Sequence, residues 1–194
     1  MTSRAAAGLV IIAAALAACA SIMPPPDSGV SITEMDLEPR IVDGPPGGPP
    51  PNGPVVEVAR GTVDGASYRM TVYRQGEGLC IDTAWSSGES LGCGAPPGDA
   101  VTGHEVFGMT GFSGADDAAH DVSGVVRSDV DAVVINTARN GQVQALMVPL
   151  GAADIDAAAF FAFLPPGVDT EALVALGADG EILESFTPLR PAGP

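Results

Sequence analysis

The feature that most restricts the fold is a series of short segments, between residues 55 and 190, in which apolar and polar residues alternate. Gly, Pro, Asn and Asp separate these segments, and the chain of 194 residues contains 25 Gly and 18 Pro. Side chains along a β-strand point alternately to the two faces of a sheet, so period-two alternation is typical of half-buried strands. The pattern therefore predicts many short strands and little helix.

Most strands are predicted where the alternation is clear, and the Gly- and Asp-rich stretch 110–121 between them is predicted to be a loop. The predicted strands are Val55–Arg60, Ser67–Arg74, Leu79–Trp85, Ser90–Cys93, His104–Met109, Val122–Val126, Ala132–Ala138, Gln142–Val148, Ala157–Leu164, Ala172–Leu176 and Ile182–Phe186. The dipeptides Asn140-Gly141 and Asp179-Gly180 tolerate positive φ, so we expect them to form two hairpin turns.

Residues 157–164 form a continuous apolar run whose length suits a buried central strand. A helix near Ala152–Ala159 is the alternative, but the run of Phe that follows favours a strand. Strands at this spacing predict an all-β, antiparallel β-sandwich over residues 55–190, with 191–194 as a tail. From about Asp121 onward the pattern resembles immunoglobulin-like or fibronectin-like modules of small secreted bacterial proteins, although no diagnostic motif is present.

The N-terminus has the layout of a signal peptide. Arg4 is its only charge, and an apolar run from Ala5 to Ala18 follows, shorter than the roughly 20 residues that span a bilayer. The run ends in Leu16-Ala17-Ala18-Cys19, which resembles the lipobox of bacterial lipoproteins: a Leu, two small residues and a Cys. An uncleaved membrane anchor extending to Met23 and an ordinary cleaved signal remain alternatives.

The lipoprotein resemblance implies that residues 1–18 are removed and that the thiol of Cys19 carries a diacylglycerol. Two or three acyl chains would anchor the chain firmly to the extracytoplasmic face of a membrane. In two-membrane bacteria, Asp after the lipidated Cys favours the inner membrane; Ala20 at this position implies the outer one.

Residues 19–54 are expected to form a mostly disordered tether between the lipid and the domain. Ten of the 18 prolines lie in residues 24–54, and proline interrupts both helices and strand ladders. A proline-ligand role is the alternative to a spacer. The apolar residues spaced through Val30–Val42 leave open that this part folds back onto the domain.

Cys80 and Cys93 are the cysteines left once Cys19 is lipidated, and in an oxidising compartment we expect them to form a disulfide. The loop closed would contain about 14 residues, which is worth roughly 3 kcal/mol in the chain-entropy model. A metal or redox role is the alternative, but two thiols alone do not complete a zinc site.

The charge of the chain excludes one class of partner. Cleavage before Cys19 would leave 7 Arg and no Lys against 24 acidic residues, a net charge of −17. A chain this acidic is repelled by phosphate backbones, so nucleic-acid binding is not expected.

The catalytic motifs that the sequence approaches are all incomplete. His104-Glu105 begins a zinc-protease motif, but Gly108 replaces its second His. Residues 111–115, Gly-Phe-Ser-Gly-Ala, imitate a nucleophile elbow that ends in Ala, with no His late in the chain. His120 lies in an acidic stretch whose spacing matches no calcium loop. No cofactor or metal site is therefore predicted.

The leading hypothesis is a lipid-anchored, non-enzymatic module that binds a protein partner in the cell envelope or organises the envelope. Trp85, His104 and His120 are speculative ligand contacts; aromatic residues such as Trp85 and Tyr68 are more often core residues. The alternatives are an enzyme or accessory subunit of a membrane complex with an unrecognised site, and a small-ligand binder.

Overall fold

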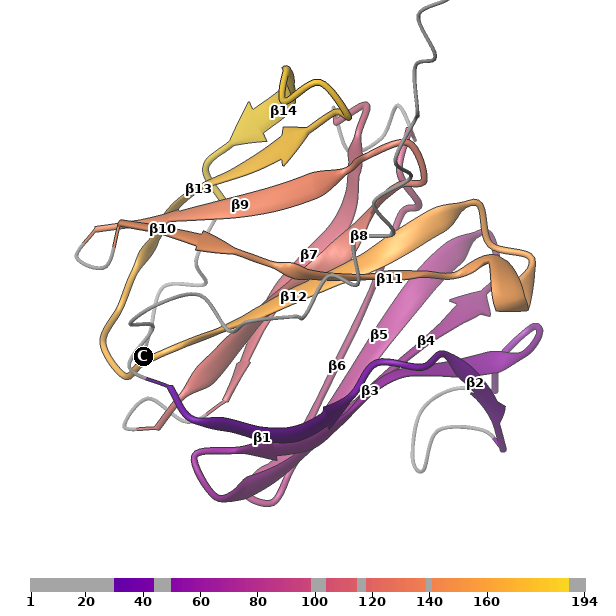
Figure 1. Cartoon of the computed structure of the whole chain (residues 1–194). Coiled ribbons are helices and arrows are strands. Elements are labelled where there is room, and N and C mark those ends of the chain that lie inside the picture. The colour runs from indigo at the N-terminus through magenta and orange to yellow at the C-terminus, as the bar shows by residue number, and fades with distance from the viewer. Residues whose placement is uncertain (1–29, 44–49, 99–103, 115–117, 139–140, 189–194) are drawn as a thin grey trace, which may run out of the picture.

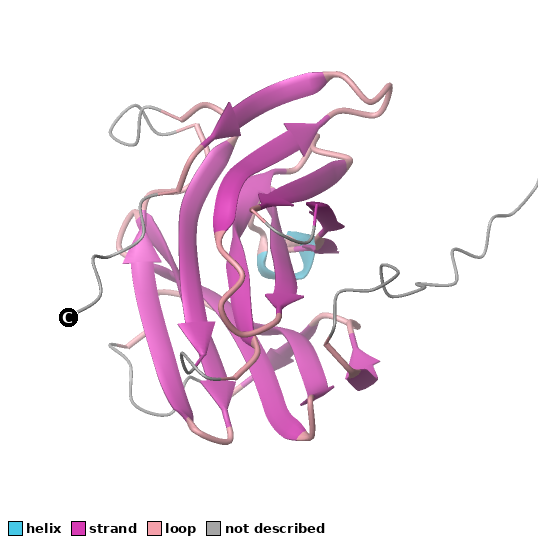
Figure 2. Ribbon diagram, turned by 90° about the vertical axis from the view of Figure 1, so that its left-hand side faces the viewer, coloured by secondary structure: helices cyan, strands magenta, loops and turns pink. Residues whose placement is uncertain are grey.

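The computed structural model describes residues 30–43, 50–98, 104–114, 118–138 and 141–188. This part of the chain is all-β: its strands form three antiparallel sheets, here called A, B and C, and one short 3-10 turn at Gly151–Ala153 (Figure 2). In Figure 1, sheet A lies lowest, sheet B in the middle and sheet C highest. The predicted all-β class with antiparallel sheets is therefore confirmed.

Sheet A is formed by the first part of the described chain, in the order β1-β3-β4-β5-β6, with β2 also paired to β3. Its strands are β1 (Ile32–Asp36), β2 (Arg40–Val42), β3 (Val55–Val63), β4 (Ala66–Gln75), β5 (Gly78–Trp85) and β6 (Gly88–Gly94). Tight turns join β3 to β4, β4 to β5 and β5 to β6, so these four strands form a meander.

The rest of the chain alternates between sheets B and C, one pair of consecutive strands at a time. Sheet B has the order β11-β12-β8-β7 and sheet C the order β10-β9-β13-β14. The strands are β7 (Phe107–Gly114), β8 (His120–Arg127), β9 (Ala132–Thr137), β10 (Gly141–Gln144), β11 (Leu146–Pro149), β12 (Ala157–Leu164), β13 (Thr170–Leu176) and β14 (Ile182–Phe186). If β7–β10 are exchanged with β11–β14, the strand order of each of these two sheets is reversed. The topology of sheets B and C therefore has pseudo-two-fold symmetry.

Strand β12 is the centre of the molecule, and every one of its residues is buried. Phe161 and Phe163 point toward sheet A, whereas Phe160 and Leu164 point toward sheet C. A strand covered on both faces needs no polar alternation, which explains the continuous apolar run. The predicted bounds and the central position of this strand are confirmed.

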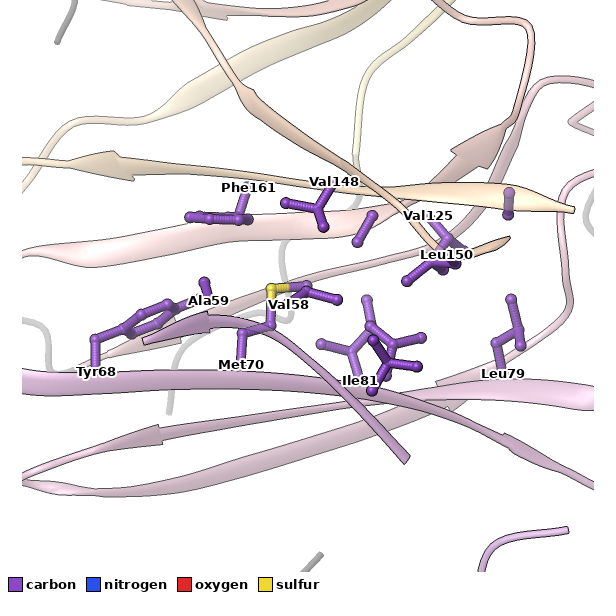
Figure 3. Close-up of a cluster of buried hydrophobic side chains, with 14 of the residues drawn as sticks. Val58, Ala59, Tyr68, Met70, Leu79, Ile81, Val125, Val148, Leu150 and Phe161 are labelled. Atoms are coloured by element: carbon purple, nitrogen blue, oxygen red, sulfur yellow. The ribbon is translucent and has the colours of Figure 1, made fainter. Parts of the chain in front are cut away.

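Two apolar layers hold the three sheets together. Between sheets A and B, Tyr68, Met70 and Ile81 pack against Phe161, Val125 and Val148 (Figure 3). Between sheets B and C, the second layer includes Phe107, Phe160, Ile135 and Leu173. Burial of a side chain of this size contributes about 1.5–3 kcal/mol.

The chain leaves sheet C and enters sheet B at Ala145. Residues 141–144 pair with β9 as predicted, but residues 146–149 pair with β12, so the prediction of one strand through Val148 is wrong. The cause is a change in which side chains are buried: Val143 and Ala145 point into the core between sheets B and C, whereas Val148 and Leu150 point into the core between sheets A and B.

The predicted tether is partly ordered. Strands β1 and β2 both pair with β3, so the segment 32–42 folds back onto the domain, and the predicted boundary at residue 55 is too late. Ile32 and Met35 pack against the A–B core, which supplies the apolar burial that this segment needs. The remaining proline clusters lie largely outside the described residues.

The stretch 110–121 is not the predicted loop. Strand β7 continues to Gly114 and β8 begins at His120, while residues 115–117 lie outside the described chain. The predicted strand His104–Met109 therefore starts too early and ends too early. Glycine weakens a strand, but Gly108 is required here: a Cβ on it would lie 2.8 Å from Pro97 N.

The immunoglobulin-like resemblance of the second half is not confirmed. An immunoglobulin-like sandwich has two sheets joined by Greek-key connections. Here the second half supplies two sheets by alternating hairpins, and sheet B carries a third sheet on its other face. What remains is the coarser likeness of antiparallel sheets packed face to face.

Candidate functional site

A buried polar cluster lies where sheets A and B meet, in a region that is otherwise apolar. Thr83 Oγ1 donates to Ser113 Oγ at 2.7 Å, and the indole Nε1 of Trp85 donates to the same oxygen at 3.0 Å. The Ser113 hydroxyl in turn donates to Asp121 Oδ1. Trp85 Nε1 also lies 3.3 Å from Asp121 Oδ1. Three strands, β5, β7 and β8, thus supply all four side chains.

Strand register explains how these residues meet. Ser113 on β7 is the direct partner of Asp121 on β8, so both side chains point to the same face of sheet B. Thr83 and Trp85 are two residues apart on β5 and share the inner face of sheet A. The cluster therefore forms across the A–B interface without any irregular backbone.

Asp121 is a fully buried carboxyl, with no exposed surface. Burial raises the pKa of Asp121 to about 6, although hydrogen bonds from Ser113, Ser123 and Trp85 favour the ionised form. At neutral pH most molecules therefore hold a buried negative charge. Burial, and secondly the charge of Asp121, raise the pKa of Tyr68 well above its usual value, so that this phenol stays neutral.

Aromatic rings pack around the apolar side of the cluster. The ring of Tyr68 meets Trp85 edge-on at 4.9 Å and Phe163 at 4.8 Å between centroids. Trp85 is only 9% exposed, so its face is covered by the protein's own rings. The indole can donate a hydrogen bond or touch a ligand at its margin, but it is not a platform for stacking a sugar.

The cluster borders a cleft between β6 and β7. One hollow of about 150 Å³ is lined by residues that include Thr83, Ser90, Gly92, Met109, Gly111 and Ser113. A second of about 260 Å³ is lined by Trp85, Ser87, Gly88, Glu89, Ser90, Phe112 and Ser113. Because Ser90, Phe112 and Ser113 line both hollows, we treat them as one cleft, called the β6–β7 cleft below.

The floor of the β6–β7 cleft carries hydroxyl groups, and its walls are small or apolar. Thr83, Ser90, Ser113 and Ser123 supply the hydroxyls, while Met109 supplies apolar surface. A Cβ on Gly111 would meet no atom within 4 Å beyond its chain neighbours, so this glycine keeps the space open. The cleft can thus accept uncharged groups that need both hydrogen bonds and apolar contact.

The predicted disulfide between Cys80 and Cys93 is present. The two residues are direct partners in the β5–β6 hairpin, and Cys80 is buried against Val55 and Tyr73 on the outer face of sheet A. The disulfide therefore fixes the strand that forms one wall of the cleft.

The structure separates the three residues predicted as ligand contacts. Trp85 borders the cleft, whereas His104 lies against β14: its Nδ1 is 2.5 Å from Glu184 Oε1 and its ring is 4.4 Å from that of Phe186. Glu184 also accepts the backbone N–H of Val106 at 2.7 Å, so this contact secures the approach to β7. His120 precedes Asp121 on β8, and strand alternation turns it toward the opposite face of sheet B.

Two further features bear on the chemistry. Within the described residues, His, Cys, Asp and Glu side chains nowhere gather in groups of three that could hold a metal ion. The same part of the chain contains no helix that is long and apolar enough to cross a membrane. The predicted signal peptide, Cys19 and the acidic pair at 116–117 lie outside the described residues.

Comparison with known proteins gives no relative: no family model, no curated protein and no solved structure matches this chain.

Sequence reasoning singled out Trp85 and Ser113 separately but missed Asp121 as their common partner. Asp121 looks in sequence like one of several solvated acids near His120. The signal that could have found Asp121 is the alternation of side chains along β8. Ala119 and Val125 face the A–B core, and Asp121 and Ser123 lie between them at steps of two residues, so they must face it too.

Proposed function

We propose that this protein is a lipid-anchored, non-enzymatic binding module of the cell envelope and that its ligand site is the β6–β7 cleft. The observation that carries the proposal is a cleft lined by Ser113 and Trp85 and backed by the fully buried carboxyl of Asp121. Burying a charge without a cationic partner costs stability, so a cluster of this kind is more easily explained by function than by folding.

The anchor is the second part of the proposal. Cleavage before Cys19 and acylation of its thiol would fix the domain to the extracytoplasmic face, on the outer membrane if there are two. The chain from Cys19 to Ile32, where β1 begins, would then be the connection between lipid and domain. Replacing Cys19→Ala should move the protein from the membrane fraction to the periplasmic or culture fraction. An unchanged membrane fraction would favour the uncleaved anchor.

The ligand site is tested in the envelope itself. A photo-crosslinking amino acid is placed at Ser87, which is exposed and lines the cleft, in the full-length lipidated protein. Gly111→Leu fills the cleft and should abolish the cross-linked product. Gly53→Leu is the matched control, because a Cβ there also meets nothing within 4 Å and neither glycine has positive φ. Equal cross-linking in both variants would rule out the cleft as the ligand site.

An enzyme is the alternative that one observation favours: Ser113 touches a carboxyl of raised pKa in a cleft. Two features weigh against it. The Ser113 oxygen already accepts hydrogen bonds from Thr83 and Trp85, and His120 is turned to the opposite face of sheet B. A fluorophosphonate probe should therefore leave Ser113 unlabelled. Labelling that Ser113→Ala removes would favour the enzyme.

A further inference from the structure

Strands β6 and β7 are neighbouring edges that do not pair with each other. β6 is the terminal strand of sheet A and β7 the terminal strand of sheet B. They converge at one end, where Met109 N–H donates to Ala95 O at 3.1 Å. Met109 also lies against Gly92 and Gly94 at this end. Toward Glu89 and Ser87 the cleft separates them.

The register of the β5–β6 hairpin shows which backbone groups of β6 point to its free edge. Cys80 and Cys93 are direct partners with a Cα–Cα distance of 4.1 Å, which identifies a non-hydrogen-bonded pair. Alternation then places the N–H and C=O groups of Glu89 and Leu91 on the free edge. Those of Ser90 and Gly92 point toward β5.

The free edge of β6 lacks the usual protection against strand addition. It is exposed, its only charged residue is Glu89, and Leu91 is 44% exposed. Natural proteins protect edge strands with several charges, prolines or bulges. At the opposite side of sheet A, the edge strands β1 and β2 carry Glu34, Asp36 and Arg40, and β1 is bulged.

The side chains of an added strand would find space on the cleft side. Ser90 and Gly92 share the inner face of sheet A with their partners Thr83 and Ile81. Residues of an added strand beside them would point into the cleft toward Gly111 and Ser113. Residues at the alternate positions would lie beside Glu89 and Leu91 on the outer face.

We propose that β6 binds an extended, positively charged peptide segment of another protein as an additional β-strand. This inference rests on the proposed function of the cleft and names its ligand class. Small apolar side chains of the segment fill the cleft, and basic side chains lie beside Glu89. The chain's net charge of −16 attracts such a segment and opposes edge-to-edge pairing of two copies of this chain.

The first test uses a synthetic seven-residue peptide in which valine alternates with arginine, and the fluorescence of Trp85, the only Trp of the chain. Two derivatives are N-methylated at alternate residues, each blocking the N–H groups of one edge. One derivative should bind about tenfold more weakly than the parent, because each lost hydrogen bond costs about 0.5–1.5 kcal/mol. The other should bind within about threefold of the parent.

The second test changes the protein. Leu91→Pro removes the N–H at the free edge and leaves the β5–β6 ladder and the disulfide in place, so it should weaken peptide binding about tenfold. Leu91→Thr keeps the N–H and is the control. Circular dichroism checks that both variants fold. If Leu91→Pro does not fold, the N-methylated peptides decide alone.

Several results would overturn the inference. They are no binding of the parent peptide, equal binding of both N-methylated derivatives, and a dimer of the protein that Leu91→Pro dissociates. If these occur while Gly111→Leu still abolishes cross-linking at Ser87, the cleft binds a ligand other than a strand and the proposed function stands. If Gly111→Leu has no effect on cross-linking, the proposed function fails on its own evidence.

Discussion

The two faces of sheet B are built in opposite ways. The face toward sheet C packs Phe160 and Leu164 of β12 against apolar residues such as Ile135 and Leu173. The face toward sheet A is equally apolar around Phe161, but at the β7 margin it contains the hydroxyl of Ser113 and the carboxyl of Asp121. Sheet B therefore forms a closed interface with sheet C and, with sheet A, an interface that opens into a cleft.

The difference shows how this small β-protein can combine stability with an open cleft. The B–C interface requires only complementary apolar shape, and it gains its stability from close packing. The A–B interface includes a buried carboxyl whose desolvation costs free energy. The close packing of the B–C interface therefore offsets the free energy that the buried carboxyl costs at the margin of the A–B interface.

Truncation of one large apolar side chain in each interface gives the largest expected contrast. Phe160 is fully buried, 5.8 Å from the ring of Phe107, so Phe160→Ala should lower the free energy of unfolding by about 3–5 kcal/mol. Met109 lines the cleft and packs against the A–B core but is only partly buried, so Met109→Ala should cost about 1–2 kcal/mol. Urea unfolding measures both. Equal losses would mean that the cleft margin is as closed as the interior.

Much of the strand layout could be predicted from sequence because local patterns determine it. Strand β12 has the predicted bounds, and the β13–β14 hairpin forms around Gly180, whose φ is +76°. Gly141 likewise has the expected positive φ of +72°, while its neighbour Asn140 lies outside the described residues. The Asp64-Gly65 turn between β3 and β4 carries the same signal, which the sequence interpretation did not use.

The parts that could not be predicted depend on contacts between distant segments. The third sheet, the passage of the chain between sheets at Ala145 and the cleft follow from which faces pack together, which no local window contains. Strand β7 is an example: three of its eight residues are glycine (Gly108, Gly111 and Gly114), yet pairing with β8 makes it a strand. Tertiary pairing here overrides low strand propensity.

Removal of the disulfide should affect the open side of the molecule selectively. Cys80→Ser combined with Cys93→Ser should lower the free energy of unfolding by about 3 kcal/mol, as expected for a closed loop of this length. Hydrogen exchange should become faster in β6, the cleft wall that the disulfide fixes, and stay unchanged in β13. Equal loss of protection in β6 and β13 would contradict a local role of the disulfide.

The carboxyl of Asp121 should give the A–B interface its own dependence on pH. Its pKa is raised from 3.8 to about 6 on folding, so the folded state binds more protons than the unfolded state between these values. Its contribution to stability therefore falls as pH rises through this window, by about 2 kcal/mol between pH 4 and pH 7.

The measurement compares wild type with Asp121→Asn, which keeps the size of the side chain and cannot ionise. The difference between their free energies of unfolding isolates Asp121, because other acidic residues contribute equally to both proteins. A difference that stays constant from pH 4 to pH 7 would show that Asp121 does not titrate as its burial requires.

The smallest expected effect comes from the indole N–H that joins sheet A to this carboxyl. Trp85→Phe keeps an aromatic ring against Tyr68 and Phe163 but removes the donor to Ser113 and Asp121, so it should cost about 1 kcal/mol at neutral pH. The hydrogen bond favours the ionised form of Asp121, so its loss should raise the pKa of Asp121 further and extend the pH window upward. Circular dichroism follows unfolding in place of tryptophan fluorescence. The same substitution in Asp121→Asn should leave the pH profile unchanged, and an identical shift there would assign the effect to packing, not to the hydrogen bond.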